Sequence, residues 1–182
     1  YEPTVFAFPQ TEKFAADAPP QPVALATTPD IRWARRDIKT TNLLGQVMAK
    51  QAAHLAGAYE ALMIAPDGDV TEAGSSSFFF IKDRELWVRP VSNDILHGIT
   101  RQTMLRVAEQ HQLKIREETY TLDQALAADE AFITAASIYV LPVGRIDDTE
   151  IGDGGAGPIT ASLRSAYLEL ARAEFPKVPE MA

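Results

Sequence analysis

Short apolar runs alternate along this chain with segments of helical periodicity, and this alternation constrains the fold more than any other feature. In residues 41–56 the apolar side chains recur at three- and four-residue steps, which predicts an amphipathic helix that ends at Gly57. The same reasoning predicts helices over 99–112, 121–127 and 159–175. Apolar runs predict strands at 60–64, 78–81, 85–88, 113–118, 130–134 and 139–143. Intermixed helices and hairpin-like strands predict an α+β (mixed α/β) fold.

Prolines mark the beginning of the chain and one late strand. Residues 9–30 contain five prolines, at positions 9, 19, 20, 22 and 29, which predicts a connecting segment with neither a helix nor a central strand. We therefore expect 1–29 to be the end of a strand from a preceding domain plus a linker, and 30–182 to form one large domain. Pro142 is expected near a sheet edge or a bulge, because proline has no N–H to donate.

Composition excludes several kinds of chemistry. The chain has 182 residues, a net charge of −8 and no cysteine, so disulfides, thiolate metal sites and cysteine nucleophiles are ruled out. With three scattered histidines (His54, His97 and His111), we expect no metal site. The acidic balance argues against nucleic-acid binding, and no apolar run is long enough to predict a membrane span. We expect a cytoplasmic protein whose chemistry comes from lysine, carboxylate or hydroxyl groups, or from a bound cofactor.

Three features could carry such chemistry. Lys39 has apolar neighbours just before a predicted helix, and a partly desolvated lysine can form a Schiff base with a carbonyl. Glu72 precedes a run of small residues and could hold a protonated ring nitrogen. Residues 98–101 begin a predicted helix, where free N–H groups and a threonine hydroxyl suit a phosphate. Taken singly, each has a plainer reading, namely an exposed lysine, a solvated turn glutamate and an ordinary helix start.

Together these features are the attachments that pyridoxal phosphate needs. The sequence resembles the class IV (fold-type IV) aminotransferases, and within them the D-amino-acid transaminases. The resemblance runs from about 32 to 170 and rests on residues 30–39, 42–45, 49–51, 70–77, 95–101, 132–143 and 151–158. It implies the large, C-terminal, cofactor-binding domain of that fold over 30–182, with a smaller N-terminal domain outside this chain.

The resemblance also implies a role for each matching residue. Lys39 would bond covalently to the cofactor and later move a proton, and Glu72 would pair with the pyridine nitrogen. Leu96 would pack on one face of the ring. The phosphate would be held by residues from two places, Ile99, Thr100 and Ser137. The chain departs from the family pattern at Ser77, where asparagine is usual, and at Ala135 and Ala136, where a hydroxyl to the phosphate is usual.

The implied activity is transamination between a D-amino acid and a 2-oxo acid by a homodimer. Branched-chain aminotransferases, (R)-amine transaminases and aminodeoxychorismate lyases of the same fold are alternatives that would keep Lys39, Glu72 and Thr100. A non-catalytic domain retained for structure or dimerisation is an alternative of another class.

Overall fold

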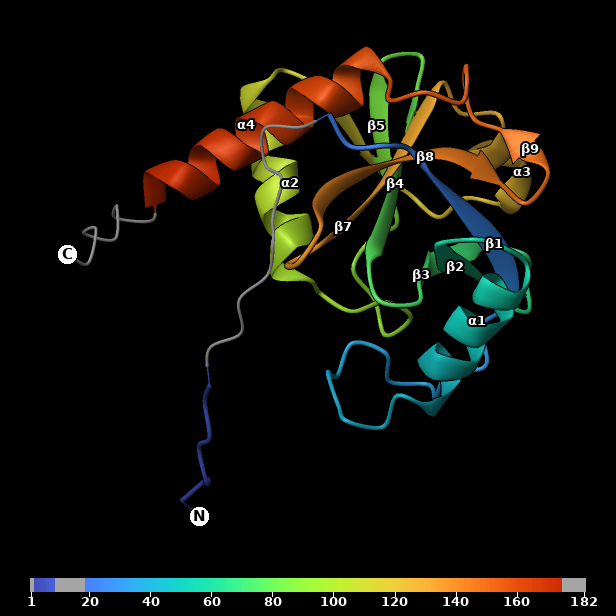
Figure 1. Ribbon diagram of the computed structural model, residues 1–182, viewed down its shortest axis with the longest axis vertical. Helices are drawn as coiled ribbons and strands as arrows, with labels where there is room; N and C mark the ends of the chain where they lie inside the picture. Colours follow the sequence, from blue (N-terminus) through green and yellow to red (C-terminus); the bar gives the residue numbers. More distant parts are fainter. Residues whose placement is uncertain (1, 9–18, 175–182) are drawn as a thin grey trace.

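A computed structural model describes residues 2–8 and 19–174 of the chain (Figure 1). Its four helices within these residues are α1 (Leu44–Leu55), α2 (Ile99–Gln110), α3 (Leu122–Leu126) and α4 (Pro158–Glu174). Its strands are β1 (Val23–Pro29), β2 (Glu60–Ile64), β3 (Val70–Ala73), β4 (Ser77–Lys82), β5 (Glu85–Val88), β6 (Lys114–Glu117), β7 (Glu130–Ala135), β8 (Tyr139–Ile146) and β9 (Thr149–Glu150). The α+β fold expected from the sequence is confirmed.

All the strands belong to one curled, mixed sheet in the order β3-β2-β1-β8-β7-β4-β5-β6, with β9 on β8. The neighbours β7 and β8, β4 and β7, and β4 and β5 are antiparallel, whereas β1 is parallel to both β2 and β8. The sheet therefore joins a parallel centre to an antiparallel meander.

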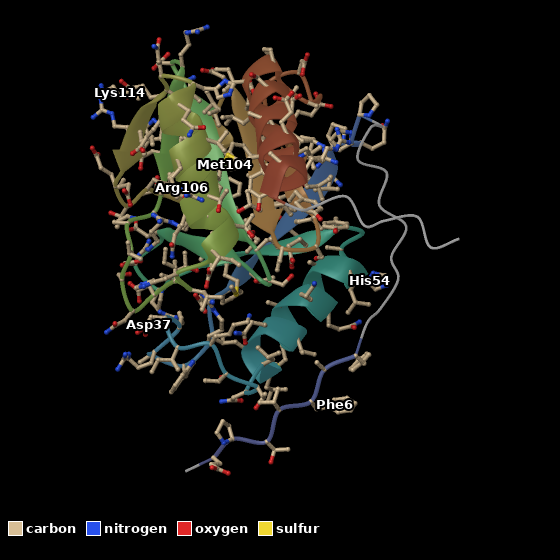
Figure 2. All side chains as sticks on the ribbon, turned by 90° about the vertical axis from the view of Figure 1, so that its left-hand side faces the viewer. Phe6, Asp37, His54, Met104, Arg106 and Lys114 are labelled. Atoms are coloured by element: carbon tan, nitrogen blue, oxygen red, sulfur yellow. The ribbon has the colours of Figure 1, made fainter. Side chains whose placement is uncertain are left out.

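Helices cover the two ends of the sheet differently. Helices α2 and α4 lie side by side over the meander (Figure 1) and share a cluster of buried side chains with it, including Phe79, Phe132, Met104 and Leu163. In Figure 2, Met104 lies between the two helices while Arg106 faces outward. Helix α1 instead packs its small residues on β1 and β2. A second cluster, which includes Leu62 and Ile133, lies on the opposite face of the sheet.

The predicted helices and strands are present, with ends shifted by a few residues. Thr121 is the N-cap of α3 and forms a capping box with Gln124. The last residue of the predicted helix 159–175 lies outside the described residues. None of the described helices is long and apolar enough to cross a membrane.

The expectation that residues 9–30 contain no central strand is wrong. Val23–Pro29 forms β1, which lies between β2 and β8 near the middle of the sheet. Its prolines do not interrupt the ladder because Pro22 precedes the strand and Pro29 is its last residue. Pro142 lies inside β8 rather than on an outer strand, but the pairing of β8 with β1 begins one residue later, at Val143, next to a register shift.

Candidate functional site

Glu72 lies on β3 and is the most deeply buried of the predicted site residues that carry a charge. Only 6% of the residue is exposed. The backbone N–H of Leu96 donates to both of its carboxylate oxygens, at 3.1 and 3.2 Å. The guanidinium of Arg32 donates to the same carboxylate through Nη1. Glu72 is therefore bonded directly to the loop that leads into α2, and the structure brings these two predicted parts of the site together.

Arg32 connects Glu72 to a second buried carboxylate. Its Nε and Nη2 donate to the two oxygens of Asp30, at 2.9 and 2.7 Å. The hydroxyl of Thr71 donates to Asp30 as well, at 2.7 Å. This arrangement places one buried cation between two buried anions, with Asp30 at the end of β1 and Thr71 beside Glu72 on β3.

The two carboxyl groups respond differently to this environment. Burial raises the pKa of Glu72 above its ordinary value, although the charge of Arg32 and the Leu96 N–H act in the opposite direction. Burial would also raise the pKa of Asp30, but its bonds to Arg32 and Thr71 outweigh burial and lower that pKa. Glu72 is thus the group that gains most from an additional positively charged hydrogen-bond donor.

The beginning of α2 has the features of an anion site. Gly98 is its N-cap, no side chain caps it, and its first turn contains no acidic residue. The first amides of a helix have no partners inside the helix and lie at the positive end of its dipole. Thr100 is buried here, whereas the side chain of Ile99 is 74% exposed. The predicted phosphate site therefore has free backbone donors and a threonine at the expected place.

Lys39 lies in a different environment from these groups, because it is exposed. It lies in the irregular segment 31–43, whose path is fixed by bonds from the Arg36 N–H to the Asn93 carbonyl (2.9 Å) and from Arg36 Nη1 to Asp94 (2.7 Å). Lys39 itself is exposed and makes no hydrogen bond or ion pair with any described residue. The expectation of partial desolvation is wrong for this structure, because the apolar neighbours Leu43 and Leu44 are exposed too.

Ser137, the other residue predicted to hold the phosphate, is not buried. It is an exposed residue of the turn between β7 and β8. Near the end of β7, just before this turn, Thr134 is 2% exposed and its hydroxyl has no hydrogen-bond partner. Directly across the ladder from Thr134 is Ser77, the residue that replaces the family's usual asparagine.

A charged cluster holds the turn that follows Glu72. Glu60, at the start of β2 and nearly fully buried, accepts a hydrogen bond from the Ser75 hydroxyl at 2.7 Å. Lys50 of α1 donates to Ser75 at 3.0 Å and lies 3.5 Å from the Glu60 carboxylate. A Cβ built on Gly74 would lie 2.8 Å from Glu60 Oε1, so a larger residue here would require this carboxylate to shift. The cluster ties α1, which follows Lys39 in the chain, to the turn after Glu72.

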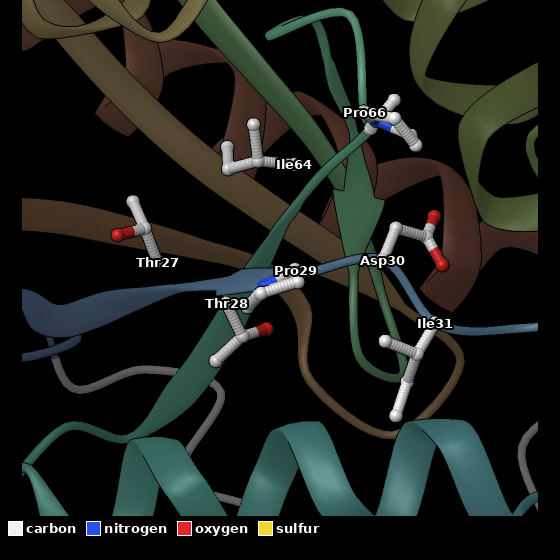
Figure 3. A pocket seen from close by; sticks show the side chains of 8 residues that line it. Thr27, Thr28, Pro29, Asp30, Ile31, Ile64 and Pro66 are labelled. Atoms are coloured by element: carbon white, nitrogen blue, oxygen red, sulfur yellow. The ribbon is translucent and has the colours of Figure 1, made fainter.

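A cavity of about 500 Å³ lies beside this site, not within it. It is lined by the ends of β1 and β2, and Figure 3 shows Asp30 and Ile31 on one side with Thr27 and Ile64 on the other. Asp30 alone connects the cavity to the network around Glu72. The described residues contain no group of three histidine or acidic side chains that could hold a metal ion.

Sequence reasoning missed two residues at this site. Arg32 lies in the stretch on which the resemblance rests, and its spacing of two residues from Asp30 is the signal that could have suggested an ion pair. Thr134 has no comparable signal, because a threonine inside a buried strand is ordinary in sequence. Its unpaired hydroxyl becomes visible only in the packed structure.

Comparison with known proteins identifies the class of this chain. Residues 1–146 match the model of the family described as "Amino-transferase class IV", so the chain belongs to the class IV aminotransferases. It is 44% identical over 144 residues to a D-alanine aminotransferase of Bacillus licheniformis, which covers 79% of this chain and 50% of that protein. It is 38% identical over 166 residues to a D-alanine aminotransferase of Staphylococcus haemolyticus, which covers 91% of this chain and 58% of that protein.

Solved structures give the same class. A branched-chain amino acid aminotransferase from T.th., with pyridoxamine 5'-phosphate, superposes with a TM-score of 0.81 at 32% identity, over 92% of this chain and 56% of that one. The holo form of a branched-chain amino acid aminotransferase from Thermobaculum terrenum superposes with a TM-score of 0.80 at 27% identity, over 86% and 53% of the two chains. The chain spans about half the length of the relatives it matches.

Proposed function

We propose that this chain is the cofactor-binding part of a pyridoxal-phosphate-dependent aminotransferase that moves an amino group between a D-amino acid and a 2-oxo acid. The observation that carries the proposal is the pair of bonds from the Leu96 N–H to Glu72, because they join the ring-nitrogen partner to the loop before the phosphate-binding helix. The 38–44% identity to D-alanine aminotransferases supports the substrate class.

The residues present fit a phosphorylated pyridine. Glu72 is a buried carboxylate whose raised pKa favours a further cationic partner, and the start of α2 has amides but no acidic side chain. An uncapped helix N-terminus and a desolvated carboxylate suit the two ends of such a molecule. Arg32 now bonds to Glu72, and its Nη2 also bonds to Asp30, so it can stay anchored while Glu72 accepts another donor.

When bound, the cofactor supplies an electron sink for the bond broken at the substrate's α-carbon. The chain's own groups then have separate roles. Lys39 would bond covalently to the cofactor and move a proton with its Nζ. Glu72 would keep the ring nitrogen protonated. Leu96 would support one face of the ring, and the amides of Ile99 and Thr100, with the Thr100 hydroxyl, would hold the phosphate.

Reductive trapping tests the assignment of Lys39. Full-length protein loaded with pyridoxal phosphate and treated with borohydride should carry the cofactor on Lys39, as located by peptide mass spectrometry. Lys39→Ala should lose the absorption band of the lysine-bound cofactor and at least about a thousandfold in transamination. Lys82→Ala is a control, since Lys82 is a half-buried lysine at the end of β4 that pairs with Asp129. Cofactor trapped elsewhere, or an unchanged spectrum in Lys39→Ala, would overturn the assignment.

A substrate panel separates the proposed activity from its nearest alternative. With 2-oxoglutarate as acceptor, we expect turnover of D-alanine and not of L-leucine or L-alanine. The similarity to branched-chain aminotransferase structures makes L-leucine the informative competitor. Turnover of L-leucine alone would replace the D-amino-acid proposal with a branched-chain one while leaving the class intact.

We also propose a cytoplasmic homodimer. Helix α1 supports an interface because Ala49 and Ala53 face the sheet, whereas Leu44, Val47 and Met48 are 67, 58 and 52% exposed. We expect a dimer in sedimentation velocity at micromolar concentration, and Leu44→Lys should weaken it. A wild-type protein that sediments as a monomer would contradict the proposal.

A further inference from the structure

Two alanines leave the phosphate site of this chain without the hydroxyl that its family usually provides on the late strand. Ala135 and Ala136 stand at those positions, and neither has a polar side chain. We propose that Thr134 replaces this missing hydroxyl and donates a hydrogen bond to the phosphate held at the start of α2, with Ser77 beside it. This inference rests on the proposed function.

The direction of the Thr134 side chain follows from its strand. Side chains alternate between the two faces of a strand. Phe132, two residues earlier on β7, belongs to the cluster under α2 and α4, whereas Ile133 belongs to the cluster on the opposite face. Thr134 therefore faces the side of the sheet that α2 covers.

Ser77 locates Thr134 along that face. It pairs directly with Thr134 across the β4–β7 ladder and lies two residues before Phe79, which faces the same side. A Cβ built on Gly98 would lie 3.5 Å from Ser77 Oγ. Because Gly98 is the N-cap of α2, the pair Ser77–Thr134 lies beneath the free amides of this helix.

The unpaired state of Thr134 indicates a missing partner. Its hydroxyl is buried and has no hydrogen bond, and such groups carry a free-energy cost unless a partner arrives. A phosphate is a strong acceptor and is the group that the neighbouring amides favour. Ser137, in the turn after β7, is exposed, so its hydroxyl is not a buried group that lacks a partner.

Comparing pyridoxal phosphate with pyridoxal isolates the phosphate contact. In full-length protein, we expect Thr134→Val, which keeps the shape and removes the hydroxyl, to weaken pyridoxal phosphate binding about tenfold and to leave pyridoxal binding unchanged within about twofold. Thr134→Ser should restore most of the affinity. The increase in melting temperature produced by inorganic phosphate should also be smaller in Thr134→Val than in the wild type.

Thr160→Val is the matched control. Thr160 is 1% exposed and its hydroxyl is likewise unpaired, but it lies at the start of α4. We expect it to leave both affinities unchanged. Equal binding of pyridoxal phosphate by wild type and Thr134→Val, or equal losses for both ligands, overturns the role of Thr134. Failure of the wild type to bind pyridoxal phosphate would instead overturn the proposed function, so the two failures are distinguishable. If Thr134→Val does not fold, Thr134→Ala is used in the same comparison.

Discussion

The N-termini of α2 and α4 both present backbone N–H groups that have no partner inside the helix, but only α4 receives a carboxylate from the chain itself. At α4 the chain provides its own anion, since Glu130 accepts the N–H groups of Ile159 and Thr160 at 3.0 and 2.7 Å. Glu130 is 8% exposed, and a Cβ on Gly157 would collide with its side chain. At α2 the N-cap is Gly98, and neither a side-chain cap nor an acidic residue is present in the first turn.

This difference separates a helix end that the chain itself caps from one that we propose binds an anion. A carboxylate held at a helix N-terminus stabilises the fold permanently, because it satisfies amides that otherwise have no partner. A helix end without such a group leaves the same amides for a ligand, at a cost to the stability of the empty protein. The comparison therefore predicts that changes at α4 act on folding, whereas changes at α2 act on anion binding.

Removing the carboxylate at α4 should have the largest effect. Glu130→Ala leaves two amides at a positive helix end without an acceptor, and we expect the free energy of unfolding to fall by about 3 kcal/mol. Urea unfolding followed by circular dichroism measures this loss. Glu130→Gln, which keeps one acceptor oxygen without the charge, should lose about half as much.

Binding provides the control for this prediction. Under conditions where Glu130→Ala is folded, its affinity for pyridoxal phosphate should match the wild type within about twofold, because the α2 end is intact. An unfolding free energy that does not change in Glu130→Ala would show that the α4 cap contributes nothing, and the contrast between the two helix ends would be lost.

The sequence predicted both helices of this comparison and the start of α2, but not the carboxylate that caps α4. The apolar periodicity of residues 99–112 predicts a helix correctly because the apolar face that contains Met104 is buried against the sheet. Strand β1 lies within a proline-rich stretch, which argues against a strand. Its prolines lie only at its ends, where they do not interrupt the hydrogen bonds of the sheet. Glu130 gave no capping signal, since it caps a helix that begins 28 residues later in the chain, at Pro158.

The candidate site shows the same limit. Glu72, Leu96 and Thr100 could be proposed as site residues because they match a family motif in order and spacing along the chain. The environment of Lys39 could not, because apolar neighbours in sequence do not ensure burial, and Leu44 beside it is 67% exposed. Thr134 depends on a cross-strand partner more than fifty residues away. Local sequence patterns predict helices and strands, whereas contacts between residues far apart in the sequence can be identified only from the folded structure.

Placing an acid at α2 should convert the proposed anion-binding end into one that the chain itself caps. The backbone of Gly98 is extended (φ −63°, ψ 136°) and a Cβ there meets nothing closer than 3.5 Å, so a side chain fits. Gly98→Asp should raise the free energy of unfolding of the empty protein by about 0.5 kcal/mol, through capping and the helix dipole. The same charge should weaken pyridoxal phosphate binding at least about tenfold, by repulsion. Chemical denaturation measures the expected gain in stability, and equilibrium binding measures the expected loss of affinity for pyridoxal phosphate.

Gly98→Asn controls for size in this experiment. Asparagine caps a helix about as well as aspartate but carries no charge. We expect it to stabilise the empty protein by a similar small amount and to retain more affinity than Gly98→Asp. Equal affinity in the two variants would mean that no anion binds at this end of α2.

The smallest effect concerns Glu72, the buried glutamate of β3 that is bonded to the loop before α2. Because burial raises the pKa of Glu72 above 4.5, the folded protein keeps this proton to a higher pH than the unfolded chain does. The resulting stability is present below the unfolded pKa and is lost as pH rises through the folded pKa, with a slope below about 1.4 kcal/mol per pH unit, the limit for one proton. Asp30, whose pKa is lowered below 3.8, has the opposite dependence in a lower pH range, so the contributions of Glu72 and Asp30 can be separated.

The variant Glu72→Gln tests this dependence because it has no proton to lose in that pH range. In urea unfolding measured from pH 4 to 7, its free energy of unfolding should vary less with pH than that of the wild type. Parallel profiles would mean that Glu72 titrates normally in the folded protein, and that the bonds from Arg32 and Leu96 fully compensate its burial.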